Sequence, residues 1–428
     1  MIPVNRSLAP EVSIPTSVNV PEAITHRLSN GVSIYVINAG EDEVVRLEII
    51  IPNSAADSNS FMIASAAHSL ADAGAKDKSA EEIAEEFDFF GSFFQNEISP
   101  DYRSFTLYSI NRFFKESLQV FLNILLNPTF PDTEVENWKR RSLQSLAVNR
   151  EKVAWLGRKA MIAGLFGPGH PYGFTPEIAD YESVTAESLR HFHHTNNDIS
   201  RGMMIISGKV DRSILDACEQ LTALPVQGGK PAGIMEQNTV IWPSLPKSLV
   251  VEKNGSIQFG LRMGMRTITK NHPDFQALSI VNTILGGYFG SRLMSNIRED
   301  KGYTYSIGSM LTPYLNAGSF TISTEVGRDV CKATAEEIRF ELKQLATVPV
   351  PDKELEIVRN YLTGTFLRSL DGPFAIADRF KGLVLYGLEY NYFKNYLDLL
   401  NNINQDQILD IASRYLNPEN MIEITSGS

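Results

Sequence analysis

The chain of 428 residues, 43% hydrophobic and 21% charged, is long enough for two or three globular domains, and its net charge of −11 argues against nucleic-acid and anionic-membrane partners. Its two cysteines, Cys218 and Cys331, are too few for a disulfide framework, and we expect reduced thiols in a cytoplasmic protein. The sequence shows no signal peptide and no apolar run of the roughly 18 residues that a membrane span needs.

The first half alternates predicted strands and helices. Residues 1–22 are rich in Pro, Ser and Val, which predicts an extended arm, and Asn30-Gly31 predicts a hairpin turn. In the rest of this half, apolar residues that recur every two positions predict strands, and those that recur every 3.6 positions predict helices. They predict strands at 45–51, 102–110 and 203–208, and helices at 60–70, from a capping box at 79–82, at 113–126, at 131–158 and at 187–194.

The second half repeats the first. Residues 184–208 lie over residues 403–427 without a gap, at a constant offset of 219, and each segment reads as a helix, a turn and a strand that ends in Ser-Gly. We therefore predict an α+β fold with two homologous α/β domains, each a largely antiparallel sheet packed with helices. The predicted bounds are 1–215, a Pro- and Gly-rich linker at 216–245, and 246–428.

The stretch 286–306 predicts a helix end, a turn and a strand. Gly302 has the position of a glycine that closes a helix in the left-handed conformation. Tyr303, Tyr305 and Ile307 then alternate with small polar residues, which places the three on one face of a strand. On local grounds alone, Arg298 is a cation in the last helical turn and Tyr305 is a half-buried sheet aromatic.

The run from Gly290 to Ser306, with its Ile-Arg-Glu-Asp-Lys-Gly-Tyr-Thr-Tyr-Ser, resembles the second-half signature of the pitrilysin/insulinase zinc peptidases (peptidase family M16). The resemblance implies that Arg298 and Tyr305 bind substrate beside a zinc ion held by an N-terminal half. It also implies that two such domains form one half of a clam-like peptidase. This chain has the length of one half.

The same resemblance exposes a degenerate zinc motif. The family's first domain carries His-x-x-Glu-His on a helix, where the two His bind zinc and the Glu activates water. Here the stretch reads His68, Ala71 and Asp72, and the third ligand position falls on Ser145 or Leu146. We therefore expect no metal in this chain and zinc in a partner subunit. Weak metal binding by His68 and Asp72, four residues apart on one helical face, stays open.

Two functions follow from the resemblance. In the first, the chain is the non-zinc subunit of a two-chain M16-type metalloendopeptidase, and Arg298 and Tyr305 donate hydrogen bonds to a peptide substrate in trans. In the second, it is a catalytically silent structural or peptide-binding homodimer, similar to the core subunits of the respiratory cytochrome bc1 complex. The substrate and the partner stay open.

Overall fold

The computed structural model describes residues 18–53, 57–196, 202–224, 242–244 and 246–427. Its first half contains most of the elements expected from the sequence. They are β1 (Ile24–Arg27), β2 (Ser33–Asn38), β3 (Val44–Pro52), α1 (Ser58–Ser69), β4 (Gly74–Ala75), β5 (Lys78–Ser79), α2 (Ala80–Phe89), β6 (Phe93–Ile98), β7 (Tyr102–Ile110), α3 (Phe114–Leu126), α4 (Asp132–Arg150), α5 (Val153–Phe166), α6 (Ile178–Ser183), α7 (Ala186–Asn196), β8 (Met203–Gly208) and α8 (Arg212–Cys218).

The second half follows a similar order of elements. They are β9 (Ser248–Val251), β10 (Gln258–Thr267), α9 (Phe275–Asn282), two π-helical segments (Thr283–Gly287 and Met294–Asp300), β11 (Thr304–Pro313), β12 (Gly318–Gly327), α10 (Cys331–Thr347), α11 (Asp352–Arg368), α12 (Pro373–Leu385), α13 (Asn391–Asn402), α14 (Gln405–Tyr415) and β13 (Ile422–Ser426). In the described part of the chain, no helix is long and apolar enough to cross a membrane.

The two large sheets share the topology of five strands, and the first has β1 as an additional edge strand. The first has the strand order β1-β2-β8-β3-β7-β6, and the second, read from its other end, has the order β9-β13-β10-β12-β11. One pair in each sheet, β2 with β8 and β9 with β13, is parallel, and the remaining pairs are antiparallel. The predicted α+β class with largely antiparallel sheets is therefore confirmed, and the common ancestry of the two halves stays a prediction.

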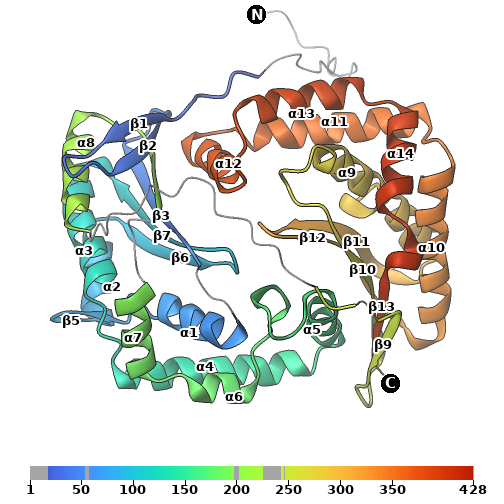
Figure 1. The fold of residues 1–428 in the computed structure, drawn as a ribbon, viewed down its shortest axis with the longest axis horizontal. Helices are drawn as coiled ribbons and strands as arrows, with labels where there is room; N and C mark the ends of the chain where they lie inside the picture. Colours follow the sequence, from blue (N-terminus) through green and yellow to red (C-terminus); the bar gives the residue numbers. More distant parts are fainter. Residues whose placement is uncertain (1–17, 54–56, 197–201, 225–241, 245, 428) are drawn as a thin grey trace, which may run out of the picture.

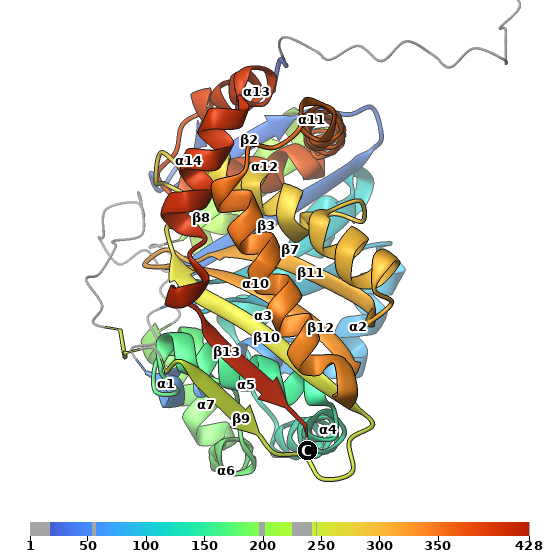
Figure 2. The same cartoon turned by 90° about the vertical axis from the view of Figure 1, so that its right-hand side faces the viewer.

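The sheets stand on opposite sides of the molecule, and each packs its outer face against helices of its own half (Figure 1). In the first half, Leu47 and Phe105 of the sheet share a core with Phe121 of α3. In the second, strand residue Ile322 shares a core with Ile338 of α10. Figure 2 shows α10 and α14 lying across the strands of the second sheet. Apolar residues on one strand face and one helix stripe thus produce a sheet backed by helices.

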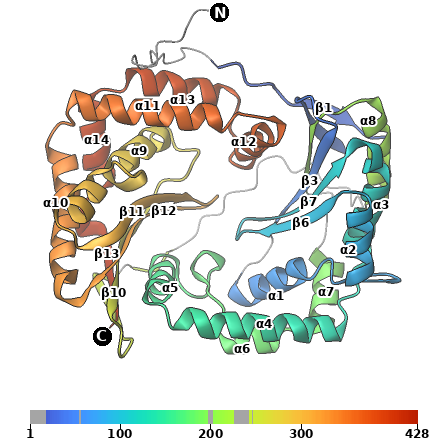
Figure 3. The same cartoon turned by 180° about the vertical axis from the view of Figure 1, so that it is seen from behind.

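One helix of each half covers the inner face of the other half's sheet. Helix α12 places Ile376 and Phe380 against Ile50 and Ile205 of the first sheet. Helix α5 places Met161, with its neighbours, against the strands β10 and β13 of the second sheet. Figure 3, seen from behind, shows both helices between the two sheets. The two halves are therefore joined by hydrophobic cores rather than by the linker alone.

Buried charges reinforce the contact between α12 and the first sheet. The Lys381 ammonium lies 2.8 Å from a Glu48 carboxylate oxygen, and an Arg46 guanidinium nitrogen lies 2.9 Å from a carboxylate oxygen of Asp378. Arg46 and Glu48 are buried on β3, so their charges are shielded from solvent, whereas the side chain of Asp378 is 54% exposed. Opposite charges on the strand and the helix therefore fix the position at which α12 docks.

Two expectations about the first half need correction. The single helix predicted over 131–158 is broken at residues 151–152, because the chain turns there to carry α5 onto the second sheet. The first core also reaches past residue 215, since Cys218, Leu221 and Leu224 are buried in it. Of the predicted linker and the predicted arm, residues 225–241, 245 and 1–17 lie outside the described residues.

Candidate functional site

Arg298 lies where the sequence places it, in the last turn of the π-helical segment Met294–Asp300. Gly302 follows with a φ of +66°, the left-handed conformation expected of a glycine that ends a helix. The segment packs on the second core through the buried side chains of Met294 and Ile297. The guanidinium of Arg298 is therefore carried by a helix end that the second core holds in place.

Polar contacts hold the same segment against α10 and α11. Arg292 donates two hydrogen bonds to Glu354, at 2.8 and 2.9 Å, in the bidentate geometry that guanidinium and carboxylate groups favour. Asn296 donates to Glu337 at 3.0 Å and to Glu341 at 2.7 Å. Burial raises the pKa of Glu341, while its hydrogen bond from Asn296 opposes that shift. These contacts position Arg298 without using its own donors.

Tyr305 does not share a face with Ile307, although the sequence predicted that it would. Tyr305 is 88% exposed and Ile307 is 3% exposed. The reason is a β-bulge: Thr304 pairs with Val326 and Ile307 pairs with Thr324, so two residues of β11 lie opposite one residue of β12. The extra residue shifts the alternation by one and turns the Tyr305 ring out of the core.

Arg298 and Tyr305 meet at the surface. The guanidinium carbon of Arg298 lies 4.7 Å from the ring centroid of Phe289 and 5.8 Å from that of Tyr305, within the range of cation–π contacts. Within the described residues, the guanidinium makes no hydrogen bond or ion pair with the protein. Two aromatic rings therefore orient a charged group whose donors are available to a ligand. Phe289 was not singled out from the sequence, although it lies just ahead of the family-like run.

A groove of about 350 Å³ runs beside Tyr305 over the second sheet. Residues with polar side chains line it, and they come from three adjacent strands: Gln258, Arg262, Thr304, Tyr305, Ser306, Ser323, Thr324 and Glu325. Such a lining offers donors and acceptors to a peptide backbone rather than an apolar pocket. Strand β11 is also the edge of its sheet.

The remains of the zinc motif lie in the other half and are buried. His68 is 2% exposed at the end of α1, and its ring contacts Phe105 at 4.4 Å between centroids. Burial, together with the nearby charge of Arg103, lowers the pKa of His68 to about 3. Neither ring nitrogen has a hydrogen-bond partner among the described residues. His68 is therefore a neutral core residue.

The two positions after His68 do not complete a metal site. The sequence predicted that His68 and Asp72 share a helical face. They do not, because helix α1 ends at Ser69. Ala71 is buried in the first hydrophobic core, and burial raises the pKa of the Asp72 carboxyl. Across the described residues, no three His, Cys, Asp or Glu side chains are grouped so as to hold a metal ion. Ser145 is exposed on α4 and Leu146 is buried, and neither side chain is a carboxylate. The residues present do not fit zinc.

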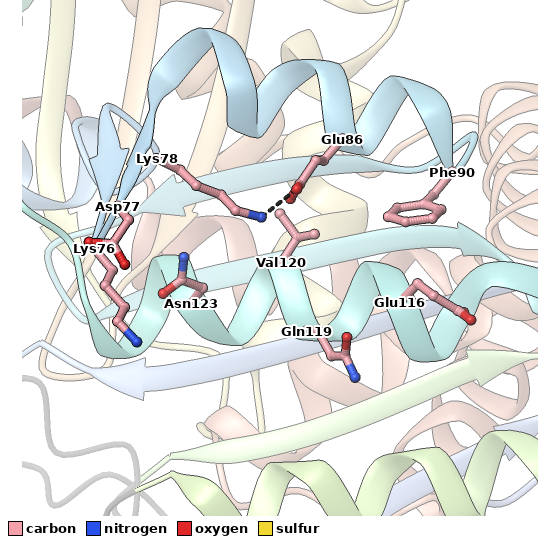
Figure 4. A pocket seen from close by; sticks show the side chains of 9 residues that line it. All are labelled: Lys76, Asp77, Lys78, Glu86, Phe90, Glu116, Gln119, Val120 and Asn123. Atoms are coloured by element: carbon pink, nitrogen blue, oxygen red, sulfur yellow. Dashed lines mark hydrogen bonds and ion pairs between the residues drawn. The ribbon is translucent and has the colours of Figure 1, made fainter.

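A second pocket, of about 400 Å³, lies outside this region between α2, α3 and the β4–β5 hairpin (Figure 4). Lys78 and Glu86 form an ion pair across it, and Gln119 and Asn123 of α3 form its floor. Its residues come from the first half alone, so it is separate from Arg298 and Tyr305.

Comparison with known sequences identifies proteins that are similar to this chain. The family described as "Peptidase M16 inactive domain" matches residues 183–362. An uncharacterized zinc protease of Rickettsia bellii is 24% identical over 402 residues, which cover 91% of this chain and 93% of that protein. The uncharacterized zinc protease YmxG of Bacillus subtilis is 23% identical over 359 residues, covering 83% and 86%.

Solved structures share the fold. The "peptidase M16 inactive domain from Pseudomonas fluorescens" superposes with a TM-score of 0.82 at 22% identity, over 95% of this chain and 98% of that chain. "A protease from Helicobacter pylori" superposes with a TM-score of 0.84 at 16% identity, over 96% and 100%. At these identities, the structural likeness concerns the fold.

Proposed function

We propose that this chain, which belongs to the peptidase M16 family, is the non-zinc subunit of a two-chain M16-type endopeptidase. The inactive domain of that family matches residues 183–362. In this proposal, Arg298 and Tyr305 bind a peptide that a zinc-bearing partner cleaves. The partner supplies the metal and the general base, and this chain supplies hydrogen-bond donors. Buried free thiols at both cysteines fit the cytoplasmic location that we also propose.

The observation that carries the proposal is the contact of Arg298 with Tyr305, whose side chain lines an open polar groove. A purely structural arginine would donate hydrogen bonds to the protein itself, as Arg292 does to Glu354. Arg298 instead is held between two rings with its donors unused in the described structure. Donors placed in this way can stabilise the negative charge that develops on a carbonyl oxygen during peptide hydrolysis.

The loss of the zinc motif explains why a partner is required. Ala71 has no group that accepts a proton, and His68 is enclosed in the core. General-base catalysis contributes roughly 10² to 10⁴ in rate, so this chain alone lacks a principal catalytic group. The catalytic metal must therefore come from another subunit if the groove serves peptide hydrolysis.

Affinity purification of the chain from its source cell, followed by mass spectrometry, tests the proposal. We expect a stoichiometric partner of similar length that contains an intact His-x-x-Glu-His motif, and peptide cleavage by the complex that a zinc chelator abolishes. Recovery of the chain only as a silent homodimer would contradict the proposal. That result would support the alternative, in which the chain resembles the cytochrome bc1 core subunits.

A further inference from the structure

We propose that Thr304 and Thr324 are positioning residues, whose hydroxyl groups hold the bulge that presents Tyr305 to the groove. This inference rests on the proposed function for its catalytic consequence, and on geometry alone for the orientation of the ring. The bulge is the feature that needs support, because the extra residue in β11 disrupts the regular ladder of hydrogen bonds with β12.

The two hydroxyls satisfy the backbone groups that the bulge leaves without ladder partners. The N–H of Ser306 donates to the Thr304 hydroxyl oxygen at 3.2 Å, and the Ser306 carbonyl accepts from the Thr324 hydroxyl at 2.9 Å. The Thr304 hydroxyl also lies 2.8 Å from the carbonyl oxygen of Glu325, the residue opposite the bulge. Side chains thus replace the missing backbone contacts on both strands.

The two threonines also contact each other, with 2.8 Å between their hydroxyl oxygens. Thr324 is 7% exposed, so water cannot readily replace its hydroxyl. Removing either hydroxyl takes hydrogen bonds from the bulge, each worth about 0.5 to 1.5 kcal/mol in general, and leaves the Ser306 carbonyl with only the other hydroxyl, at 3.0 Å in the case of Thr304. The loss of these hydrogen bonds destabilises the bulged conformation of β11 but not a regular pairing of β11 with β12.

The regular ladder is the competing state, and it misplaces Tyr305. With Ile307 kept opposite Thr324, a strand without the bulge would set Ser306 opposite Glu325 and Tyr305 opposite Val326. Tyr305 would then share the face of Ile307, which lies in the second core. Loss of the hydroxyls therefore turns the phenol of Tyr305 away from the groove.

The orientation is tested on the free chain, without a partner. Exposed tyrosines react with tetranitromethane, and peptide mass spectrometry reports the nitration of Tyr305 itself. We expect Thr324→Val and Thr304→Val to lower the nitration rate of Tyr305 at least about threefold, in line with loss of a hydrogen bond. Thr324→Ser, which keeps the hydroxyl, should restore it.

Thr321→Val is the matched control, because Thr321 lies on the same strand opposite Met310, in the regular part of the ladder. It should leave the nitration of Tyr305 unchanged. Circular dichroism identifies folded variants, and the serine variant keeps the test decisive if a valine variant fails to fold. Unchanged nitration of Tyr305 in folded Thr304→Val and Thr324→Val chains would overturn the proposal, whatever the protein's function.

The catalytic consequence is tested in the complex with the zinc-bearing partner. Thr324→Val should lower kcat more than it raises KM, and should cause no further loss in a Tyr305→Phe background, because both changes act through one hydroxyl group. Additive losses in that cycle would overturn the positioning role. Altered nitration with unaltered turnover would instead support the geometric proposal and contradict the proposed function.

Discussion

At the scale of single residues, the half-buried Arg298 lies against the exposed Tyr305, and neither side chain donates a hydrogen bond within the described residues. We expect Arg298→Ala and Tyr305→Phe each to lower kcat of the reconstituted complex by roughly 10², the effect of removing a donor to a developing oxyanion. Stability should hardly change, because Tyr305 is exposed and Arg298 pairs with no carboxylate in the described structure. Steady-state kinetics with a fluorogenic peptide and thermal unfolding measure both quantities.

Two further variants refine that prediction. Arg298→Lys should recover only part of the activity, because an ammonium lacks the planar fork of a guanidinium. Tyr303→Phe is the control for Tyr305→Phe, since Tyr303 packs against the second core outside the groove. Equal losses from the two tyrosine variants, or none from any variant, would argue against a role for this site in turnover.

His68 should make the protein less stable in acid. Its pKa is lowered from 6.5 to about 3 in the folded chain, chiefly by burial. Between these values the unfolded chain binds a proton that the folded chain excludes, so stability is present above pH 6.5 and is lost as the pH falls toward 3. From pH 7 to pH 5, this single group should remove about 2 kcal/mol from the free energy of unfolding.

Urea unfolding of the wild type and of His68→Leu at both pH values isolates that contribution. Other titrating groups are common to the two proteins, so only the difference between their pH dependences reports on His68. We expect the leucine variant to lose about 2 kcal/mol less than the wild type. Parallel pH profiles would show that the His68 ring is hydrated or protonated in the folded state.

At the scale of elements, α5 approaches the second sheet through glycine. A Cβ at Gly157 would lie 2.9 Å from the hydroxyl of Ser426, which is buried and bonded to the Val153 carbonyl. Gly157→Ala should therefore lower the free energy of unfolding by about 1 kcal/mol or more, as overpacking does. Gly364, in α11, has no atom within 4 Å of its added Cβ. Gly364→Ala should raise stability by roughly 0.5 to 1 kcal/mol through helix propensity.

Guanidinium unfolding of both alanine variants checks this pair. The same substitution in two helices should change stability in opposite directions, because only one position faces a packed strand. A stabilised Gly157→Ala variant would mean that α5 can move outward at little cost. The predicted close packing of helix on sheet would then be wrong.

At the scale of the whole molecule, the exchange of α5 and α12 makes each half dependent on the other. Residues 1–224 alone would expose Ile50 and Ile205, which α12 now covers. Residues 246–428 alone would likewise expose Ile422 and Ile424, which α5 covers. Uncovered apolar faces of this kind favour aggregation and loss of cooperative folding. We expect soluble, cooperatively unfolding protein only when both fragments are expressed together.

Thermal unfolding followed by circular dichroism, together with size-exclusion chromatography, compares the fragments with the intact chain. The matched control is the complete chain cut in the linker after folding, which should keep its cooperative transition. A fragment 1–224 that unfolds cooperatively by itself at the temperature of the intact chain would contradict the dependence.

The purified chain should also hold no stoichiometric zinc and should not cleave unstructured peptides by itself. Ala71 and Asp72 occupy two positions of the zinc motif, and α1 ends before both of them. Elemental analysis after dialysis against zinc gives the metal content, with the zinc-bearing partner as the positive control. One tightly bound zinc per chain would refute this expectation and would point to ligands outside the described residues.

Features that depend on neighbouring residues were predictable from the sequence. The capping box at Ser79 and Glu82, the helix end at Gly302 and the strands predicted at 45–51, 102–110 and 203–208 all appear in the structure, because each depends largely on residues close together in the chain. Arg298 and Tyr305 were singled out by the resemblance of residues 290–306 to the M16 signature, and their role in binding substrate stays a prediction.

The direction of those side chains depends on contacts between segments that are far apart in the chain. Local alternation placed Tyr305 on the face of Ile307, whereas pairing with β12 inserts a bulge that turns it outward. Thr324 supports that bulge from another strand, and no local pattern announces a contact across a sheet. The break after α4 has a similar cause, since α5 docks on a sheet formed more than 80 residues later in the chain. Periodicity records which face of an element is apolar, but the partner of that face is chosen by the packing of the whole chain.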